Sequence, residues 1–258
     1  MKDDHSTTER AFWTLGEDRP SRWLITCDHA TNRVPRWVGG GELGIADADM
    51  GRHIAYDVGA AGVAERLAAL MDAPAILSDF SRLVIDPNRK RSAKDLVRRV
   101  TEGHALTFNE GVDEEEVERR WETLHAPYHE AVDAQITARK ASSDAPFLLM
   151  SVHTFTNNYM GQERALEFGV LFDDYEDFAI ELERGVAAQG FTSGLNVPYS
   201  GAEGLMYAPH RHGTAHAIPY IELEVRQDLL DTPEKVEDVA SRFITALEPA
   251  LGRLLRPV

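Results

Sequence analysis

The chain is poor in cysteine and in long apolar stretches. Its 258 residues include one cysteine, Cys27, which cannot form an internal disulfide, so the fold does not depend on an oxidising compartment. No segment approaches the ~20 apolar residues of a membrane-spanning helix, and the polar residues 1–10 contain no apolar signal core. We therefore expect a soluble, cytoplasmic protein without a membrane partner.

Positive charge is also scarce. The chain has 27 Lys and Arg residues against 43 Asp and Glu residues, which gives a net charge of −16. So acidic a surface excludes nucleic acid as a natural partner, because the basic groups at 89–91 and 98–99 are short. No linker or repeat divides the chain, so we expect a polar lead-in over residues 1–20 and one domain over residues 21–258. The oligomeric state stays open.

Apolar runs of strand length alternate with helical patterns along the chain. Strands are predicted at residues 22–27, 75–77, 146–152, 168–172 and 219–226, and helices at 57–71, 113–139, 177–189 and from 233 to about 247. Pro127 should kink or split the second helix, and residues 92–110 and 201–216 are predicted as long loops. This order predicts a single α/β domain with a mostly parallel sheet, whose ligand site lies at the carboxyl ends of the strands.

The stretch Ser81–Arg89 carries two arginines around a short apolar run. Residues 83–85 are predicted as a strand core, with Arg82 before it and Asn88 and Arg89 after it. A guanidinium group is a rigid fork that can hold a carboxylate at two points. Either arginine could instead form an ordinary salt bridge with one of the many acidic residues. Their position at a strand end favours a binding site.

Histidines follow two of the predicted strands. His29 comes after residues 22–27, and His153 after residues 146–152. A lone histidine more often bonds to its own loop, and the alternation around Glu224 could equally mark a solvent-facing strand. His125 and His129 lie four residues apart on the predicted helix, but no acidic base separates them as in metalloprotease helices, so we interpret them as helix-surface residues.

Two imidazoles and one carboxylate make a three-ligand zinc site with a fourth position left for water. A water molecule on zinc has a pKa lowered to about 7. A glutamate that is not a ligand can move its proton to a leaving amine, and an arginine can stabilise the oxyanion. With a carboxylate clamp added, these groups predict hydrolysis of the amide bond in an acidic N-acyl amino acid.

The ordered blocks CDHATNRVP, DADMGRH, SRLVIDPNR, SVHTFT, NVPYS and IELEVRQDLL resemble the N-formylglutamate amidohydrolase family over about residues 20–235, and more distantly the zinc carboxypeptidases. The resemblance implies a mixed central sheet flanked by helices on both faces. It also implies Zn²⁺ as cofactor and a small acidic N-acyl amino acid as substrate, with N-formyl-L-glutamate giving formate and glutamate in amino-acid catabolism.

Carried over to this sequence, the resemblance implies His29 and His153 as zinc ligands, Glu224 as the base and Arg82 as the oxyanion arginine. Carboxypeptidases take their second ligand from His-x-x-Glu, but this position is Asn32 here, a poor zinc ligand. We therefore expect Asp49 as the third ligand. Asp47 and His53 are the alternative candidates for this ligand. The candidates for substrate binding are Asn88, Arg89 and Tyr199.

Two other functions remain open. The first is a carboxypeptidase-like peptidase that acts on small peptides or peptidoglycan fragments. The second is a binding protein that keeps the carboxylate clamp but has lost catalysis.

Overall fold

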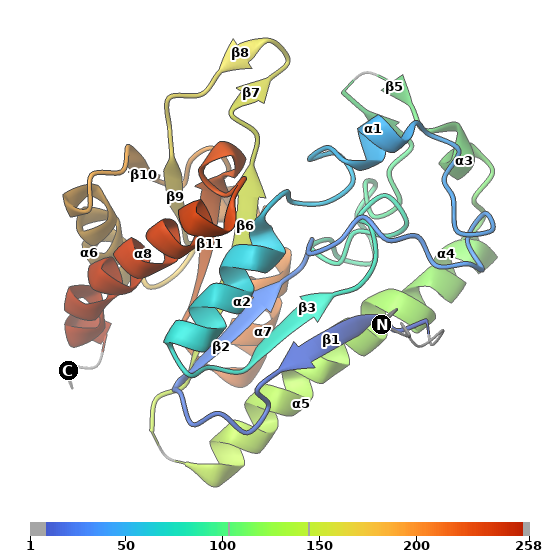
Figure 1. The fold of residues 1–258 in the computed structure, drawn as a ribbon. Helices are drawn as coiled ribbons and strands as arrows, with labels where there is room; N and C mark the ends of the chain where they lie inside the picture. The colour runs from blue at the N-terminus through green and yellow to red at the C-terminus, as the bar shows by residue number, and fades with distance from the viewer. Residues whose placement is uncertain (1–8, 103, 144, 255–258) are drawn as a thin grey trace, which may run out of the picture.

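The computed structural model describes residues 9–102, 104–143 and 145–254. A seven-stranded sheet forms its centre (Figure 1). In the order of the sheet, the strands are β1 (Phe12–Leu15), β3 (Ala75–Ser78), β2 (Trp23–Cys27), β6 (Leu148–Phe155), β11 (Tyr220–Arg226), β9 (Phe168–Leu171) and β10 (Ser193–Leu195).

The four central strands β3, β2, β6 and β11 run parallel to one another. The sheet is mixed because β1 is antiparallel to β3, and β9 is antiparallel to β11. Strand β10 is parallel to β9. The predicted single α/β domain with a mixed, mostly parallel sheet is therefore confirmed. The central strands are buried on both faces, which explains their continuous apolar sequences.

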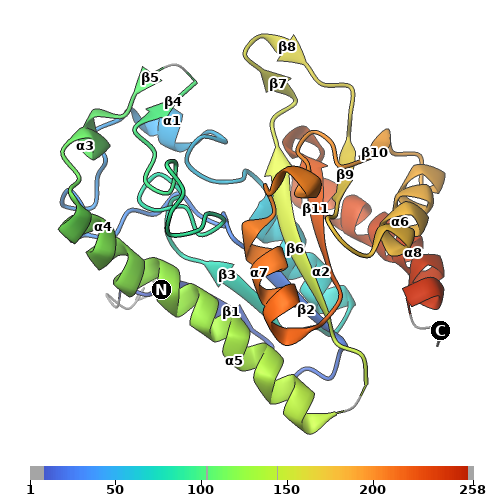
Figure 2. The ribbon, with the colours of Figure 1, turned by 180° about the vertical axis from the view of Figure 1, so that it is seen from behind.

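Helices cover both faces of the sheet (Figures 1 and 2). On one face α2, α6 and α8 share an apolar core with the sheet, and on the other α5 and α7 pack against it. The helices are α1 (Asp47–Met50), α2 (Ala60–Leu70), α3 (Thr107–Glu110), α4 (Glu114–Arg120), α5 (Ala126–Ser142), α6 (Glu176–Ala188), α7 (Tyr207–His216) and α8 (Pro233–Leu254). A π-helical segment, Trp121–His125, joins α4 to α5, and short 3₁₀ turns occupy Gly201–Glu203 and Gln227–Leu229.

Four segments differ from the sequence prediction. The predicted loop 92–110 contains two short strands, Val100–Thr101 and His104–Ala105, and helix α3. Residues 12–15 pair with β3 as an edge strand, so the sheet begins within the expected lead-in. Residues 83–85 are fully buried but form a turn and a short irregular segment rather than a strand, and their side chains pack in a hydrophobic core. The predicted loop 201–216 contains helix α7.

Pro127 interrupts the regular hydrogen bonding of the predicted helix, as expected, although the helix continues past it. Pro127 lies in the first turn of α5, directly after the π-helical segment. Since proline has no N–H to donate, the regular helical hydrogen bonding cannot pass through it unchanged. The wider π turn carries the chain across this point, with the Ala126 N–H donating to the Trp121 carbonyl.

Two projections rise at the carboxyl end of the parallel strands (Figure 1). One contains α1 and the hairpin β4 (Val100–Thr101) and β5 (His104–Ala105), and the other is the hairpin β7 (Asn158–Tyr159) and β8 (Gln162–Glu163). The rings of His53 and Tyr159 approach across the gap, with centroids 6.5 Å apart. Among the described residues, no helix is long and apolar enough to cross a membrane.

Candidate active site

A cavity of about 630 Å³ lies at the carboxyl end of the parallel strands. Its floor carries His29, two residues after β2, together with His153 from β6 and Glu224 from β11. Parallel strands end at one edge of the sheet, which is why residues far apart in sequence meet here. The structure therefore brings these three residues together at the predicted location of the site.

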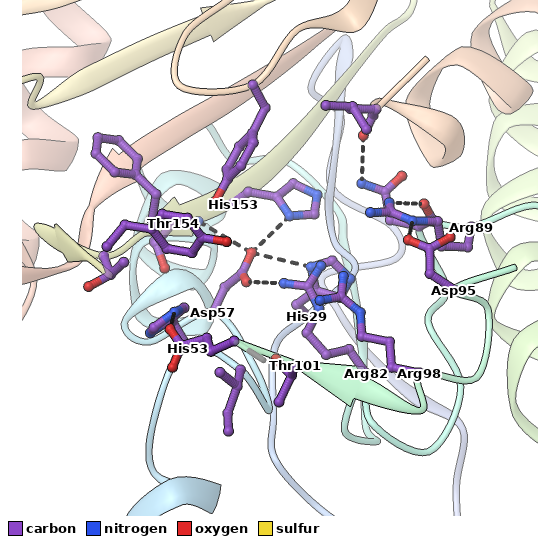
Figure 3. A pocket seen from close by; sticks show the side chains of 18 of the residues that line it. His29, His53, Asp57, Arg82, Arg89, Asp95, Arg98, Thr101, His153 and Thr154 are labelled. Carbon is purple, nitrogen blue, oxygen red and sulfur yellow. Dashed lines mark hydrogen bonds and ion pairs between the residues drawn. The ribbon is translucent and has the colours of Figure 1, made fainter. Parts of the chain in front are cut away.

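Asp57 joins the two histidines in a tight, buried group (Figure 3). Its Oδ2 atom lies 2.8 Å from Nδ1 of His153 and 3.3 Å from Nδ1 of His29. All three side chains are at most 4% exposed. Two ring nitrogens and one carboxylate oxygen thus converge on a single point beside the cavity, in the arrangement of a three-ligand metal site.

The outer ring nitrogens of both histidines face further carboxylates. His29 Nε2 lies 2.7 Å from Oδ1 of Asp86, and His153 Nε2 lies 3.0 Å from Oδ2 of Asp28. A carboxylate accepts the Nε2 proton, so a neutral ring keeps its lone pair on Nδ1. Three lone-pair-bearing atoms then face one another, and a cation between them satisfies all three. The residues therefore fit a zinc ion.

Charge in this group favours a cation. Burial alone would lower the pKa of His153, but Glu222, Asp28 and Asp57 raise it well above its ordinary value. Burial alone would raise the pKa of Asp57, but His29, His153 and Arg82 hold it far below the usual range. Asp57 is thus a carboxylate at any working pH, and the site attracts positive charge to the histidines.

The expected third ligand, Asp49, lies elsewhere. Its side chain is 45% exposed on α1, where it pairs with Arg52 at 3.0 Å. The alternatives are also used differently: Asn32 donates to the Met50 carbonyl, Asp47 is exposed, and His53 pairs with Glu102 at the rim of the cavity. Asp57 replaces Asp49 as the carboxylate of the group.

Tertiary contacts place Asp57, which the sequence prediction treated as the start of a helix. Its N–H donates to the His29 carbonyl, and this hydrogen bond holds the loop before α2 against His29. Gly59 then begins α2 with φ +85°, and a Cβ there would come 2.7 Å from the Leu230 side chain. An acid in front of a glycine that opens an apolar helix was the available signal.

Glu222 and Glu224 point into the core of the site rather than into solvent. They are 2% and 4% exposed, respectively, and one Oε atom of each has no hydrogen-bond partner in the described part of the chain. Burial raises the pKa of both, that of Glu222 to about 7. Glu224 is paired with His153 in the β11–β6 register, whereas Glu222 lies 3.6 Å from the outer nitrogen of that ring.

Arg82 links the metal-binding group to Asp86. One terminal nitrogen donates to Asp57 Oδ1 at 3.0 Å, and the other to Asp86 Oδ2 at 3.3 Å. Its side chain is 15% exposed and lines the cavity. A fixed cation beside the metal-binding group is the arrangement required to stabilise a developing oxyanion.

Asn88 and Arg89 both line the cavity, but their side chains already have partners. The Asn88 amide accepts from Ala208 N–H and donates to the Leu205 carbonyl, which ties the turn to the start of α7. Arg89 donates to Asp95 at 2.6 Å and to the Asn88 carbonyl. Asp95 is 52% exposed, so an incoming carboxylate competes with a solvated ion pair.

Tyr199 reaches the cavity from the loop after β10. Its ring lies beside the guanidinium group of Arg164, 5.8 Å from the ring centroid. Burial and the nearby Glu224 raise the pKa of its phenol, so Tyr199 is a hydrogen-bond donor at neutral pH. Of the residues predicted for the site, only Asp49 and its alternatives Asn32 and Asp47 do not line this cavity.

His125 and His129 are not surface residues, contrary to the sequence prediction. They are 1% and 2% exposed. His129 Nε2 lies 2.9 Å from the Pro87 carbonyl, and His125 Nε2 lies 2.9 Å from the Arg89 carbonyl. Carbonyls only accept, so both rings donate and hold the turn that carries Asn88. The sequence pattern did not reveal the burial of these two histidines, because the turn that carries Asn88 covers the helix face that was expected to face solvent.

Two solved structures share the fold of this chain along nearly its whole length. A gene product from Agrobacterium tumefaciens has a TM-score of 0.90 and 26% identity, covering 96% of this chain and 97% of that chain. An N-formylglutamate amidohydrolase from Ralstonia eutropha has a TM-score of 0.64 and 16% identity, covering 93% and 97%. A sequence search of the curated proteins found no match.

The sequence pattern that defines N-formylglutamate amidohydrolases matches residues 21–230 of this chain. The chain therefore belongs to the N-formylglutamate amidohydrolase family and is an amidohydrolase. The resemblance noted from the sequence blocks is confirmed.

Proposed function

We propose that the protein is a zinc-dependent amidohydrolase that removes the acyl group from N-acyl acidic amino acids, with N-formyl-L-glutamate as its substrate. The convergence of His29 Nδ1, His153 Nδ1 and the Asp57 carboxylate on one point beside the cavity carries this proposal. Family membership supports the reaction, and the arginines around the cavity support an anionic substrate.

His29, His153 and Asp57 would hold the metal. When bound, zinc supplies a water of lowered pKa and polarises the scissile carbonyl. Asp86 and Asp28 fix the two rings by accepting their Nε2 protons. Because both acceptors are fully buried, the rings stay oriented with Nδ1 toward Asp57 throughout the reaction.

Glu224 acts as the general base and then as the general acid. Its unpartnered Oε2 takes one proton from the attacking water, and the oxygen of that water forms the new bond to the acyl carbon. Glu224 then delivers the proton to the nitrogen as the C–N bond breaks. One amide and one water thus give formate and the free amino acid, with the base restored.

Arg82 donates to the carbonyl oxygen as negative charge develops on it. Such donors are typically worth about 3 kcal/mol in the transition state. Arg89 holds the α-carboxylate of the substrate in exchange for Asp95, and Asn88 keeps this turn attached to α7. Tyr199 lies across the cavity as a further donor to the substrate.

Hydrolysis of a panel of N-formyl, N-acetyl and N-succinyl amino acids, with small peptides included, tests the proposal. The metal is first removed with a chelator, and zinc is then added back in equimolar amount. We expect turnover of N-formyl-L-glutamate by the zinc-loaded protein and none by the metal-free protein. Equal turnover in both forms would refute metal dependence, and preference for peptides would instead favour a peptidase.

A further inference from the structure

Arg98 is a third arginine of the cavity that the proposed mechanism does not use. It comes from the segment between Asn88 and β4, and its side chain is 22% exposed. One terminal nitrogen lies 3.2 Å from Asp86 Oδ2. Its Nε is buried and has no hydrogen-bond partner among the described residues. A buried donor without a partner, beside a cavity, is an unfilled binding position.

The partner of Arg98 is shared with other donors. Oδ2 of Asp86 also receives Arg82, at 3.3 Å. Its Oδ1 receives His29 Nε2 at 2.7 Å and the Asn88 N–H at 3.0 Å. One carboxylate therefore serves two guanidinium groups, a histidine and a backbone donor.

Like charges crowd together where Arg98 and Arg82 share one carboxylate of the cavity wall. The neighbouring Arg82 and then burial lower the pKa of Arg98 below its ordinary value, which reflects crowding of like charges. Asp57, the other carboxylate at Arg82, is needed in the metal-binding group. An anionic group from the substrate would relieve this repulsion between the two guanidinium groups.

The three arginines hold different places around the cavity (Figure 3). Arg82 touches both Asp57 and Asp86, whereas Arg98 touches Asp86 alone and so lies one step further from the reacting centre. Arg89 pairs with a different carboxylate, that of Asp95. A dicarboxylic amino acid carries one carboxylate on its α-carbon and another at the end of its side chain, and two separate cations can bind the two groups.

We propose that Arg98 binds the side-chain carboxylate of the substrate, while Arg89 binds its α-carboxylate. This assignment rests on the proposed function. It makes Arg98 the residue that selects acidic over neutral N-acyl amino acids, with its unpartnered Nε completing a two-point contact. Asp86 holds the guanidinium group in place for this contact.

Two variants and three substrates test the assignment. The variants are Arg98→Met and Arg89→Met, and the substrates are N-formyl-L-glutamate, N-formyl-L-glutamine and N-formyl-L-isoglutamine. Glutamine replaces the side-chain carboxylate by an amide, and isoglutamine replaces the α-carboxylate. In the parent protein we expect kcat/KM for formylglutamate to exceed that of either amide by about 10- to 100-fold, as for charge-assisted hydrogen bonds.

Each variant should lose one preference and keep the other. Arg98→Met should bring the glutamate-to-glutamine ratio close to one and retain the glutamate-to-isoglutamine ratio, and Arg89→Met should do the reverse. Arg98→Lys should keep part of the first preference. A uniform loss on all three substrates would overturn the assignment, because it would mean that Arg98 acts only by supporting Asp86.

Failure of the proposed function would give a different result. In that case the parent protein with zinc would hydrolyse none of the three compounds. Calorimetric binding of L-glutamate and L-glutamine to the parent and to Arg98→Met then decides the role of Arg98 without turnover. Equal affinities of the parent for both amino acids would overturn it, whereas a preference for glutamate that Arg98→Met abolishes would support it.

Discussion

Asp57 completes, with His29 and His153, a group of side chains that could hold a metal ion. Each ring has a carboxylate at its Nε2 atom, and Asp57 is the carboxylate that lies beside the Nδ1 atoms of both rings in the described part of the chain. Its carboxylate is anionic and buried. Without this carboxylate, the two Nδ1 atoms lack the third ligand atom of the group.

Asp57→Ala should therefore abolish stoichiometric zinc binding. We expect the zinc affinity to fall by more than the roughly 10- to 100-fold that is typical of losing an outer hydrogen-bond partner. Metal analysis after dialysis measures this. Asp49→Ala is the matched control, because Asp49 is partly exposed and pairs with Arg52. Zinc loss in the Asp49 variant with retention in the Asp57 variant would reverse our assignment.

Glu224 and Glu222 allow a second matched comparison, since they lie two residues apart on the same face of β11. Glu224→Gln should lower kcat by about 10³-fold, within the range for a lost general base, and leave zinc content unchanged. Glu222→Gln should cost far less, because Glu222 lies on the outer side of the His153 ring. Steady-state kinetics decides, and an active Glu224→Gln variant would remove its role as base.

The sequence predicts those site residues that follow or lie in long apolar strands, because a parallel sheet fixes where the strand ends point. His29, His153 and Glu224 are of this kind. Asp57 is not, because a loop places it, and the loop is docked by one hydrogen bond to the His29 backbone. Asp49, eight residues earlier, carries the same side chain, and the only local difference is the glycine that follows Asp57 at the start of an apolar helix.

At the scale of elements, the junction of α4 and α5 supports the turn that carries Asn88 and Arg89. The π-helical segment brings His125 toward the Arg89 carbonyl, and the Trp121 ring stacks on it with centroids 3.7 Å apart. One turn later, His129 donates to the Pro87 carbonyl and contacts His212 on α7 at 2.8 Å. Two helices therefore fix the backbone around Asn88.

Replacing His129 tests this support. His129→Leu removes the donor to the Pro87 carbonyl, and a net loss of about 1 kcal/mol per hydrogen bond predicts a rise in KM of about fivefold with a smaller change in kcat. His129→Gln keeps a donor at the same reach and should restore most of the affinity. Kinetics on N-formyl-L-glutamate measure both. Should the two variants behave alike, the hydrogen bond does not position the turn.

The order of elements was predictable where apolar periodicity was long and regular. Strands β2, β6 and β11 and helices α2, α6 and α8 confirm the corresponding predictions. The prediction of a strand at residues 83–85 was wrong, because a buried turn and a buried strand produce the same short apolar pattern. Helix α7 was missed because Gly213 and three histidines weaken its helical signal; a Cβ at Gly213 would clash with the Tyr220 ring.

The whole molecule combines an acidic exterior with buried histidines on one side of the sheet. The net charge is −16, yet His125, His129 and His212 are enclosed among Trp121, α5 and α7. Burial lowers the pKa of all three, that of His125 to about 4. These histidines are therefore neutral in the folded protein.

Their burial makes global stability depend on pH. An unfolded histidine binds a proton near pH 6.5, whereas folded His125 does so only near pH 4. Between these values the unfolded state holds more protons, so the contribution of His125 is complete above pH 6.5 and is lost as the pH falls toward 4. His153 has a raised pKa and opposes this trend, so the effect must be isolated with a variant.

His125→Gln provides this isolation, because glutamine can donate to the Arg89 carbonyl but does not titrate. We expect the free energy of unfolding of the parent, relative to that of the variant, to fall by about 2 kcal/mol between pH 7 and pH 5, as the shift of the His125 pKa requires. Denaturant titrations of both proteins at a series of pH values measure the difference. A difference that does not change with pH would show that His125 takes up its proton as readily in the folded protein as in the unfolded chain.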